Sequence, residues 1–311
     1  MSALEAVGLA VLQTGIVVAT APLLNGAVKR MKARLQLRQG PPLLQSYQDL
    51  AKWLSKSERV ADNASFVHWL APVGVLAATF SALLFVPLLT AEAPFTTSGD
   101  ILVVIGLLAL GRALLTLGGM DSGAAFGQMG SSREVAIGSL VEPVLLVSLA
   151  ALCLEPQSTR LEDIMRFGDN DPGAFLGLGW ALAAAAFAIV LVAETGRIPV
   201  DNPDTHLELT MVHEGPLLEY AGRDLALLQW TAAARHWIVL VLVAELALPH
   251  PGPFGVQLLA LATSLAVLVP LLAMIETAQA KLRILRVPLL LGGGLVLCLM
   301  GLAANLLGVS A

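Results

Sequence analysis

The chain has 311 residues, of which 57% are hydrophobic and 13% charged, and its mean hydropathy is +0.79. This composition excludes a water-soluble globular protein and favours a polytopic membrane protein, because a helix needs about 20 mostly apolar residues to cross roughly 30 Å of hydrocarbon. The formal net charge of −5 says little about partners, so the distribution of charge along the chain is more useful.

The hydropathy pattern predicts an all-α membrane protein with eight transmembrane helices and additional cytoplasmic amphipathic helices. No internal repeat or low-complexity tract interrupts it, so residues 1–311 are predicted to form a single polytopic membrane domain. The expected spans are approximately residues 3–28, 66–90, 101–118, 135–152, 175–194, 231–248, 256–276 and 287–309.

The basic residues are distributed unevenly between the two sides of these spans. Fifteen of the 18 Lys and Arg residues fall at one set of loops and span ends, mostly between spans one and two. Cytoplasmic loops carry an excess of Lys and Arg, so this side is predicted to be cytoplasmic and both termini to be outside. The predicted location is a prokaryotic cytoplasmic (inner) membrane.

The first cytoplasmic loop, residues 29–65, contains an amphipathic segment. After Gly40-Pro41-Pro42, apolar residues recur at helical spacing up to Leu54, and polar residues fill the opposite face. At about 14 residues the segment is too short to span a bilayer, which favours an interfacial helix. A lipid anchor and a lining or docking helix explain this pattern equally well. The charged candidates for docking are Arg38, Asp49 and Lys52.

The connection between spans three and four is rich in glycine. Five glycines lie between Gly118 and Gly130, which permits tight backbone approach and left-handed conformations. Residues 119–133 are therefore predicted to form a loop, either for packing against another subunit or as a simple tight connection. Its charged candidates are Asp121 and Arg133.

The second large cytoplasmic loop, residues 195–230, is acidic. Seven acidic residues lie between Glu194 and Asp224, opposed by two arginines, on the side where basic residues are usual. A helical stretch is predicted from about Thr205 until Gly222 ends it. A solvated acidic surface is the simple interpretation, and a proton-handling or docking surface is the functional one. The residues concerned are Glu194, Arg197, Asp201, Glu208, Glu214 and Glu219.

Two opposite charges are predicted at similar depth inside the membrane. Arg112 lies about six residues from the cytoplasmic end of span three, and Glu142 about seven residues into span four, so both are roughly 10 Å deep. Charges there face protein or water rather than lipid. We therefore expect Arg112 to pair with Glu142, and Pro143 to open span four to water. Glu276 is interpreted as an interfacial residue at the end of span seven.

Cysteine and histidine patterns give no sign of a cofactor. Cys153 and Cys298 stand alone, and the histidines form no pair four residues apart. The sequence His213-Glu214 begins like a zinc-protease motif, but Leu217 occupies the second histidine position. We expect no catalytic residue, no metal site and no cofactor in this chain.

Several of these segments together resemble one family. Over nearly the whole chain, their order and the eight-span layout are similar to the membrane subunit that joins the peripheral and membrane arms of respiratory complex I and of related membrane-bound nickel–iron hydrogenases. The matching motifs are Arg38-Gln39-Gly40-Pro41 with Gln45, Tyr47, Asp49 and Lys52; Asp121-Ser122-Gly123 to Arg133-Glu134; Glu142-Pro143; and Glu194, Arg197, Pro199 and Asp201 leading to Glu208, Glu219 and Gly222.

Two departures from the complex I pattern resemble the formate hydrogenlyase type of subunit, which works without quinone. The segment after Arg38 is compact, and Asn202-Pro203-Asp204-Thr205-His206 replaces part of an acidic run. Arg38 and the amphipathic helix would border a quinone-like cavity if one exists.

The resemblance implies a non-redox subunit of a multisubunit oxidoreductase. It would anchor a peripheral iron–sulfur small subunit and a hydrogenase-like large subunit, whose clusters and nickel–iron centre lie outside this chain. With antiporter-like membrane subunits and the lipid bilayer around it, it would couple electron transfer to proton or sodium-ion movement; no nucleic acid is involved. The alternatives are the equivalent subunit of a quinone-reducing complex I and an independent secondary transporter, which often shows two repeats that this chain lacks.

Overall fold

The computed structural model describes residues 3–88, 94, 100–170, 177–202, 211–247 and 254–307. Within these residues the chain is built from helices, and one isolated β-bridge joins Asp100 to Arg160. The helices are α1 (Ala3–Leu35), α2 (Gln45–Leu54), α3 (Phe66–Leu83), α4 (Ile101–Asp121), α5 (Ala125–Cys153), α6 (Leu161–Asn170), α7 (Leu178–Glu194), η3 (Pro216–Glu219), α8 (Gly222–Ala247), α9 (Phe254–Ala278), η4 (Ile284–Arg286) and α10 (Val287–Leu306).

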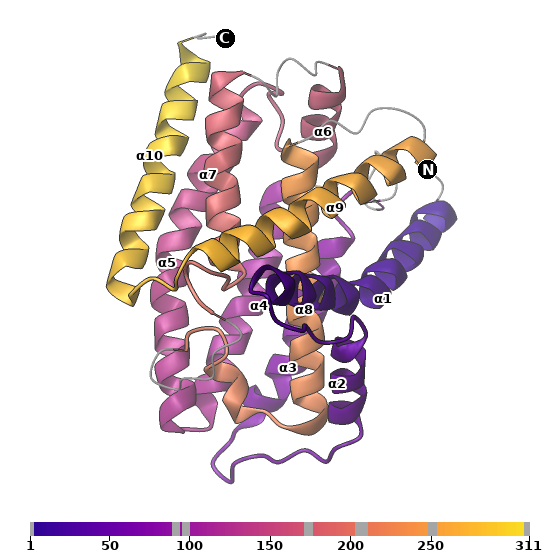
Figure 1. The fold of residues 1–311 in the computed structure, drawn as a ribbon, viewed down its shortest axis with the longest axis vertical. Coiled ribbons are helices and arrows are strands. Elements are labelled where there is room, and N and C mark those ends of the chain that lie inside the picture. The colour runs from indigo at the N-terminus through magenta and orange to yellow at the C-terminus, as the bar shows by residue number, and fades with distance from the viewer. Residues whose placement is uncertain are drawn as a thin grey trace.

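Each of the eight predicted spans corresponds to one helix. Among the described residues, seven helices are long and apolar enough to cross a membrane, and α7 is a shorter apolar helix of 17 residues. The predicted all-α membrane class is therefore confirmed. Figure 1 shows the first turn of α1 and the last turn of α10 in the upper half of the molecule, with α2 below.

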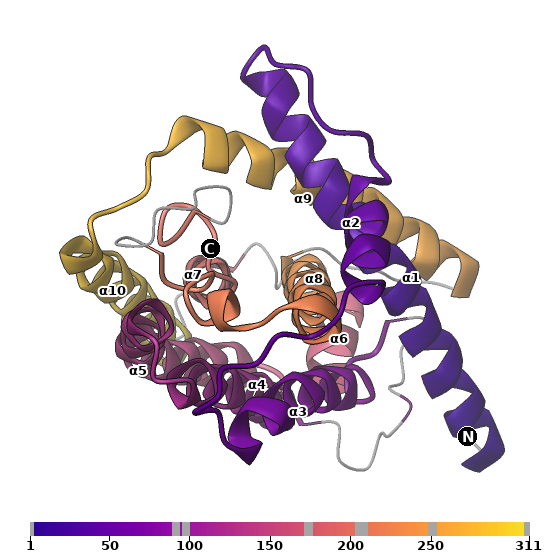
Figure 2. The ribbon, with the colours of Figure 1, turned by 90° about the horizontal axis from the view of Figure 1, so that it is seen from below.

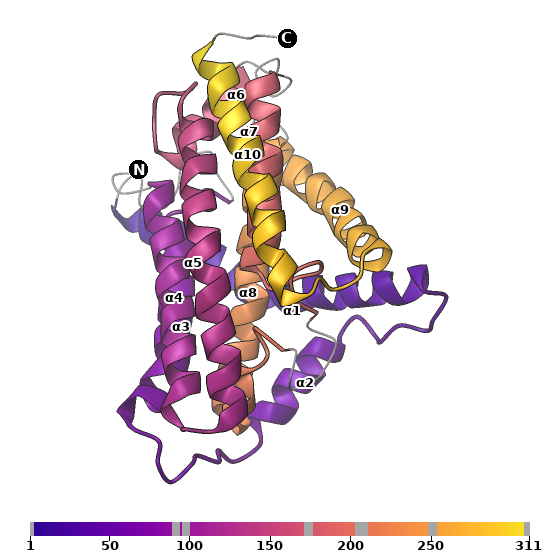
Figure 3. The same ribbon diagram turned by 90° about the vertical axis from the view of Figure 1, so that its left-hand side faces the viewer.

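Helix α8 runs through the middle of the bundle, and the other helices surround it (Figures 1 and 2). Helices α5, α7 and α10 pack together on one flank, and α3 packs along α4. The main apolar core lies between these elements and includes Trp180, Phe187, Ile238 and Leu242, all buried. Helices α1 and α9 lean obliquely against this bundle (Figures 1 and 3).

Two predicted boundaries are wrong. Helix α4 continues to Asp121 and α5 already begins at Ala125, so most of the predicted loop 119–133 is helical. Gly130 permits the close approach of the acidic loop, because a Cβ on it would lie 2.6 Å from the Cα of Gly215, whereas Gly123, with a φ of +73°, lies in the turn between α4 and α5. Similarly, α8 begins at Gly222, whose φ is +58°, so this glycine starts a helix instead of ending one.

The amphipathic helix predicted in the first loop is present as α2. It buries Leu50, and the Tyr47 hydroxyl donates a hydrogen bond to the carbonyl of Ala19 on α1. It also packs against α8. In the acidic loop, residues 203–210, including Glu208 and the start of the predicted helical stretch, lie outside the described residues. The short turn η3 is the helical element found between residues 211 and 221.

Candidate functional site

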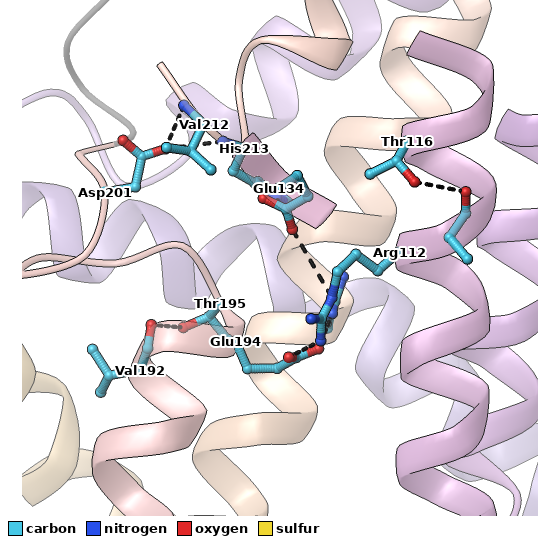
Figure 4. Close-up of polar contacts among 11 residues, drawn as sticks. Arg112, Thr116, Glu134, Val192, Glu194, Thr195, Asp201, Val212 and His213 are labelled. Carbon is cyan, nitrogen blue, oxygen red and sulfur yellow. Dashed lines mark hydrogen bonds and ion pairs between the residues drawn. The ribbon is translucent and has the colours of Figure 1, made fainter. Parts of the chain in front are cut away.

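A buried cluster of four charged residues lies where α4, α5, α7 and α8 meet. Glu194 ends α7 and is 4% exposed, and its two carboxylate oxygens accept hydrogen bonds from Arg112 of α4 and Arg235 of α8. The Nε of Arg112 lies 4.0 Å from an oxygen of Glu134 on α5. We call Arg112, Glu134, Glu194 and Arg235 the central cluster. Figure 4 shows Arg112 between its two carboxylates.

The absence of a side chain on α5 makes room for Arg112. A Cβ added to Gly138 would lie 2.5 Å from Nη1 of Arg112, so the guanidinium passes directly over this glycine. Glycine is the residue that permits so close an approach. The central cluster therefore depends on a small residue in α5 as well as on the charges themselves.

His213 connects Glu134 to the acidic loop. Its Nδ1 lies 3.7 Å from a Glu134 oxygen, an ion-pair distance that is longer than a hydrogen bond. Burial opposes protonation of this imidazole, but the neighbouring Glu134 carboxylate outweighs burial and raises the pKa of His213 above its ordinary value. Glu134 therefore favours the protonated, positively charged form of His213.

Asp201 joins both ends of the acidic loop. Its carboxylate accepts hydrogen bonds from the backbone N–H groups of Val212 at 3.2 Å and His213 at 3.0 Å. It also pairs with Lys281 of the α9–α10 connection at 2.5 Å. Asp201 is 2% exposed, so the burial of its charge is offset by these partners. It therefore fixes His213 beside Glu134, as Figure 4 shows.

A second buried cluster lies around Arg197. Its Nη1 pairs with Glu276 of α9 at 3.3 Å, and its Nη2 donates a hydrogen bond to the Oδ1 of Asn25 on α1 at 2.7 Å and lies 2.8 Å from the Nδ1 of His236. Glu276 also pairs with Lys32 at 2.7 Å. Glu276, near the end of α9, is 2% exposed, so it is buried within the protein. We call Lys32, Arg197, His236 and Glu276 the second cluster.

The predicted pairing of Arg112 with Glu142 is also wrong. Arg112 binds Glu194, whereas Glu142 is exposed on the outer face of α5. Glu142 nevertheless lies within a span that is long and apolar enough to cross the membrane. A carboxylate at such depth avoids lipid, which points to a neighbouring protein surface or water on that face.

Of the two remaining acidic candidates that the structure describes, Glu219 stabilises the loop. Glu219 accepts hydrogen bonds from the hydroxyl of Ser122 at 2.7 Å and the N–H of Gly127 at 3.1 Å, so it holds the loop onto the α4–α5 turn. Glu214 is half-buried and has partners within the chain. Among the described residues, no group of three or more His, Cys, Asp or Glu side chains could hold a metal ion.

The predicted docking residues divide into two kinds. Arg38 and Lys52 are exposed, and Asp49 is half-buried and accepts a hydrogen bond from Gln45 at 3.0 Å. Asp121 accepts two hydrogen bonds from Ser65, each 2.6 Å, and Arg133 donates to the carbonyl of Met211 at 3.1 Å. The last two residues therefore have structural roles in this chain, and the first three remain available at its surface.

Tyr220, just before α8, closes the loop against α3. Its ring stacks on that of His68, with centroids 4.3 Å apart. Burial, reinforced by the carboxylates of Asp224 and Asp121, raises the pKa of Tyr220, so its hydroxyl stays protonated. Tyr220 also packs in a small apolar cluster with Leu217 and Leu228. This cluster fixes the end of the acidic loop to the bundle.

Several residues of the site were not among the sequence-based candidates. Among them, Glu134, His213, Arg235, His236 and Lys281 each contact a sequence-based candidate, whereas Lys32 pairs with Glu276. Arg235 and His236 carried a usable signal, because both are ionisable residues inside predicted span six. Lys281 carried none, since it lies in a basic connection that resembles an ordinary positive loop.

The sequence matches the NADH dehydrogenase family over residues 7–305. It is 34% identical over 261 residues to hydrogenase-4 component C of Escherichia coli (strain K12), which covers 83% of this chain and 80% of the relative. Formate hydrogenlyase subunit 4 of the same organism is 32% identical over 284 residues, with 88% and 90% covered. A subunit of NADH-quinone oxidoreductase from Koribacter versatilis (strain Ellin345) is 29% identical, with 67% and 52% covered.

A solved structure shares the fold. A chain in the structure of the membrane-bound sulfane sulfur reductase (MBS), an archaeal respiratory membrane complex, superimposes with a TM-score of 0.86 at 19% sequence identity. The match covers 96% of this chain and 99% of that chain, so the helical arrangement is shared throughout.

Proposed function

Because the chain belongs to the NADH dehydrogenase family, we propose that it is the membrane subunit that anchors a peripheral redox arm and couples electron transfer to ion translocation. The favoured complex is an energy-converting hydrogenase or a formate hydrogenlyase-like complex. In support, the chain covers 80% and 90% of the relatives named for hydrogenase-4 and formate hydrogenlyase, but 52% and 75% of the first two NADH-quinone oxidoreductase relatives.

The observation that carries the coupling role is the continuity of the buried charges. The central cluster and the second cluster are linked by Arg235 and His236, which are adjacent on α8, and by the turn from Glu194 to Arg197. His213 and Asp201 extend the network to Lys281. Ionisable groups buried in a membrane bundle are costly, so a connected series of them indicates an ion path.

The network also has the polar atoms that internal water needs. The Nε atoms of Arg112 and Arg235, the Nε2 of His236 and the hydroxyl of Tyr220 are buried and make no hydrogen bond within the described part of the chain. Buried donors are normally satisfied by protein or by ordered water. We infer that water molecules join these groups into a path along which protons or hydrated ions move.

Arg112 is suited to act as the switch in this path. It binds Glu194 and lies 4.0 Å from Glu134, so a small displacement exchanges one carboxylate partner for the other. Displacing Arg112 from Glu194 would raise the proton affinity of that carboxylate, because it would lose one of its two positive partners. A movement of His213 and its loop would therefore change the charge balance inside the bundle.

The redox chemistry is assigned to partner subunits. The proposal places iron–sulfur clusters and the nickel–iron centre in a peripheral small and large subunit, and antiporter-like subunits beside the exposed Glu142 face. Arg38, Asp49 and Lys52 would contact the peripheral arm. The location would be the inner membrane of a prokaryote, with the basic loops cytoplasmic and both termini outside.

Ion uptake and electron transfer should separate in suitable variants. In inverted vesicles containing the intact complex, Glu142→Gln should reduce proton or sodium-ion uptake by at least tenfold, while hydrogenase activity with an artificial electron donor stays close to wild type. Asp62→Asn, which changes an exposed carboxylate of the first loop instead of one within a predicted span, is the matched control. Normal uptake in Glu142→Gln would remove this residue from the ion path.

The equivalent subunit of a quinone-reducing complex I is the second candidate, because relatives named as subunits of NADH-quinone oxidoreductase also match. Identification of the proteins that co-purify in mild detergent distinguishes the two. A large subunit with the cysteine ligands of a nickel site would establish the hydrogenase branch, and a large subunit without them, together with quinone reduction, would establish the other.

A further inference from the structure

The carboxyl-terminal end of α1 turns back over its own last turns. Leu37 has a φ of +57°, and the N–H of Arg38 donates a hydrogen bond to the carbonyl of Ala33 at 2.8 Å, which is the bond that closes a Schellman motif. Gly40 then approaches the helix so closely that a Cβ would lie 3.0 Å from the Cα of Arg30. The reversal therefore returns Arg38 to the side of α1.

This reversal encloses a polar cavity of about 450 Å³. Its walls come from the end of α1, residues 36–41, the beginning of the acidic loop and the end of α9. The polar lining consists of Lys29, Lys32 and Arg38, the amides of Gln36, Gln39 and Asn202, and the carboxylate of Glu276. We call this space the α1-end cavity.

The α1-end cavity carries a surplus of positive charge. Glu276 is already compensated, because Lys32 lies 2.7 Å and Arg197 3.3 Å from its oxygens. Lys29 and Arg38 are exposed and form no ion pair within the part of the chain that the structure describes. Two free cations beside amide donors match an anion with several oxygen atoms, such as a phosphate group.

The surroundings identify the source of that phosphate. Four exposed leucines, Leu35, Leu37, Leu43 and Leu44, flank the reversal, and Leu37 is 97% exposed. Apolar side chains next to cations are typical of a segment lying between lipid headgroups and acyl chains. A soluble anion would not require the leucines, whereas a lipid would contact them with its acyl chains.

We propose that the α1-end cavity binds the phosphate of an anionic phospholipid in the leaflet on the basic side of the protein. The planar guanidinium of Arg38 can donate bidentate hydrogen bonds to two phosphate oxygens, and the ammonium of Lys29 contributes a point charge. Because Lys32 and Glu276 form the inner wall, the lipid would lie directly against the second cluster. The lipid site needs no ion translocation and no redox reaction, so it stands apart from the proposed function.

The test measures lipid retained by the purified complex. After exchange into detergent containing equal amounts of phosphatidylglycerol and phosphatidylcholine, bound lipid is quantified per chain by native mass spectrometry. Each cation near an anionic group contributes a factor of about five in affinity. Lys29→Gln with Arg38→Gln should therefore lower phosphatidylglycerol affinity roughly 30-fold. Arg34→Gln, an exposed arginine of α1 outside the cavity, should not change it.

Four results would overturn the lipid assignment. The first two are equal retention of phosphatidylglycerol by the double variant and the control, and equal retention of the two lipids by the wild type. The third is loss of phosphatidylglycerol when inorganic phosphate is added in large excess. The fourth is crosslinking of residue 38 to a partner protein instead of to lipid. The thermal midpoint of the double variant is measured in parallel. It should match that of the wild type in lipid-free detergent, because neither side chain has an ion pair to lose in the described structure.

Discussion

Arg112 on α4 donates a hydrogen bond to Glu194, the last residue of α7, and so ties the interior of one span to the end of another. The same carboxylate binds Arg235, and Glu134 supplies the second negative charge of the central cluster. All four residues are buried, so their charges are compensated mainly by each other and only weakly by solvent.

Glu194→Gln should strongly destabilise the protein. The substitution removes one of two negative charges and leaves two buried arginines opposed by Glu134 alone. Removing one partner of a buried ion pair costs about 3–5 kcal/mol, so the thermal midpoint in detergent should fall clearly or assembly should fail. Combining it with Arg112→Gln restores the charge balance. The double variant should therefore lose less stability than the sum of the losses in the two single variants. Strictly additive losses would contradict a direct interaction between Arg112 and Glu194.

The Glu134–His213 pair should make stability depend on pH. The pKa of His213 is raised in the folded protein, so the pair stabilises the folded state. This stabilisation is complete below the unfolded pKa of about 6.5 and is lost as the pH rises through the folded pKa. The thermal midpoint of the wild type should exceed that of His213→Gln most at about pH 6 and least at about pH 9. A difference that grows with pH would show that His213 is neutral at this site.

Asp201 should control the mobility of the loop that holds His213. Asp201→Ala removes the acceptor for the N–H groups of Val212 and His213. Hydrogen bonds to a charged group contribute about 1.5–3 kcal/mol, so exchange of these two amide hydrogens should accelerate roughly 10- to 100-fold. Lys281→Met serves as the control, because it removes the ion pair but leaves both backbone hydrogen bonds. Equal exchange rates in both variants would show that Lys281 alone holds Asp201.

The sequence sufficed for the eight spans, but in the two buried clusters it selected only Arg112, Glu194 and Arg197, and it could not assign their partners. Hydropathy estimates how deep a residue lies and not which face of the helix it occupies. Glu134 and Glu142 are eight residues apart on α5, which places them about 80° apart around the helix axis. That angle separates the buried Glu134 from the exposed Glu142. Depth in the span selected Glu142 as a candidate, whereas Glu134 appeared only within a family motif.

The other errors came from contacts between residues distant in sequence. Asp201 and Lys281 are 80 positions apart, and no local pattern predicts that the two connections meet. The glycines of residues 118–130 were interpreted as loop residues because glycine is common in turns. In the folded chain four of them permit the close approach of the acidic loop, namely Gly118, Gly119, Gly127 and Gly130.

The close contact between α5 and the acidic loop gives the last prediction. Gly130→Ala places a Cβ 2.6 Å from the Cα of Gly215 and 2.9 Å from the Cδ of Pro216, so the loop must move. Overpacking of this kind costs about 1–3 kcal/mol, although alanine is the better helix former. Gly106→Ala on α4 is the matched control, because its Cβ would meet nothing within 4 Å. In detergent, the thermal midpoint should fall for Gly130→Ala and stay constant or rise for Gly106→Ala. The Gly130 variant should also lose ion uptake more than artificial-donor activity, since the displaced loop carries His213 away from Glu134. A Gly130→Ala variant as stable as the wild type would mean that the loop does not rest on α5.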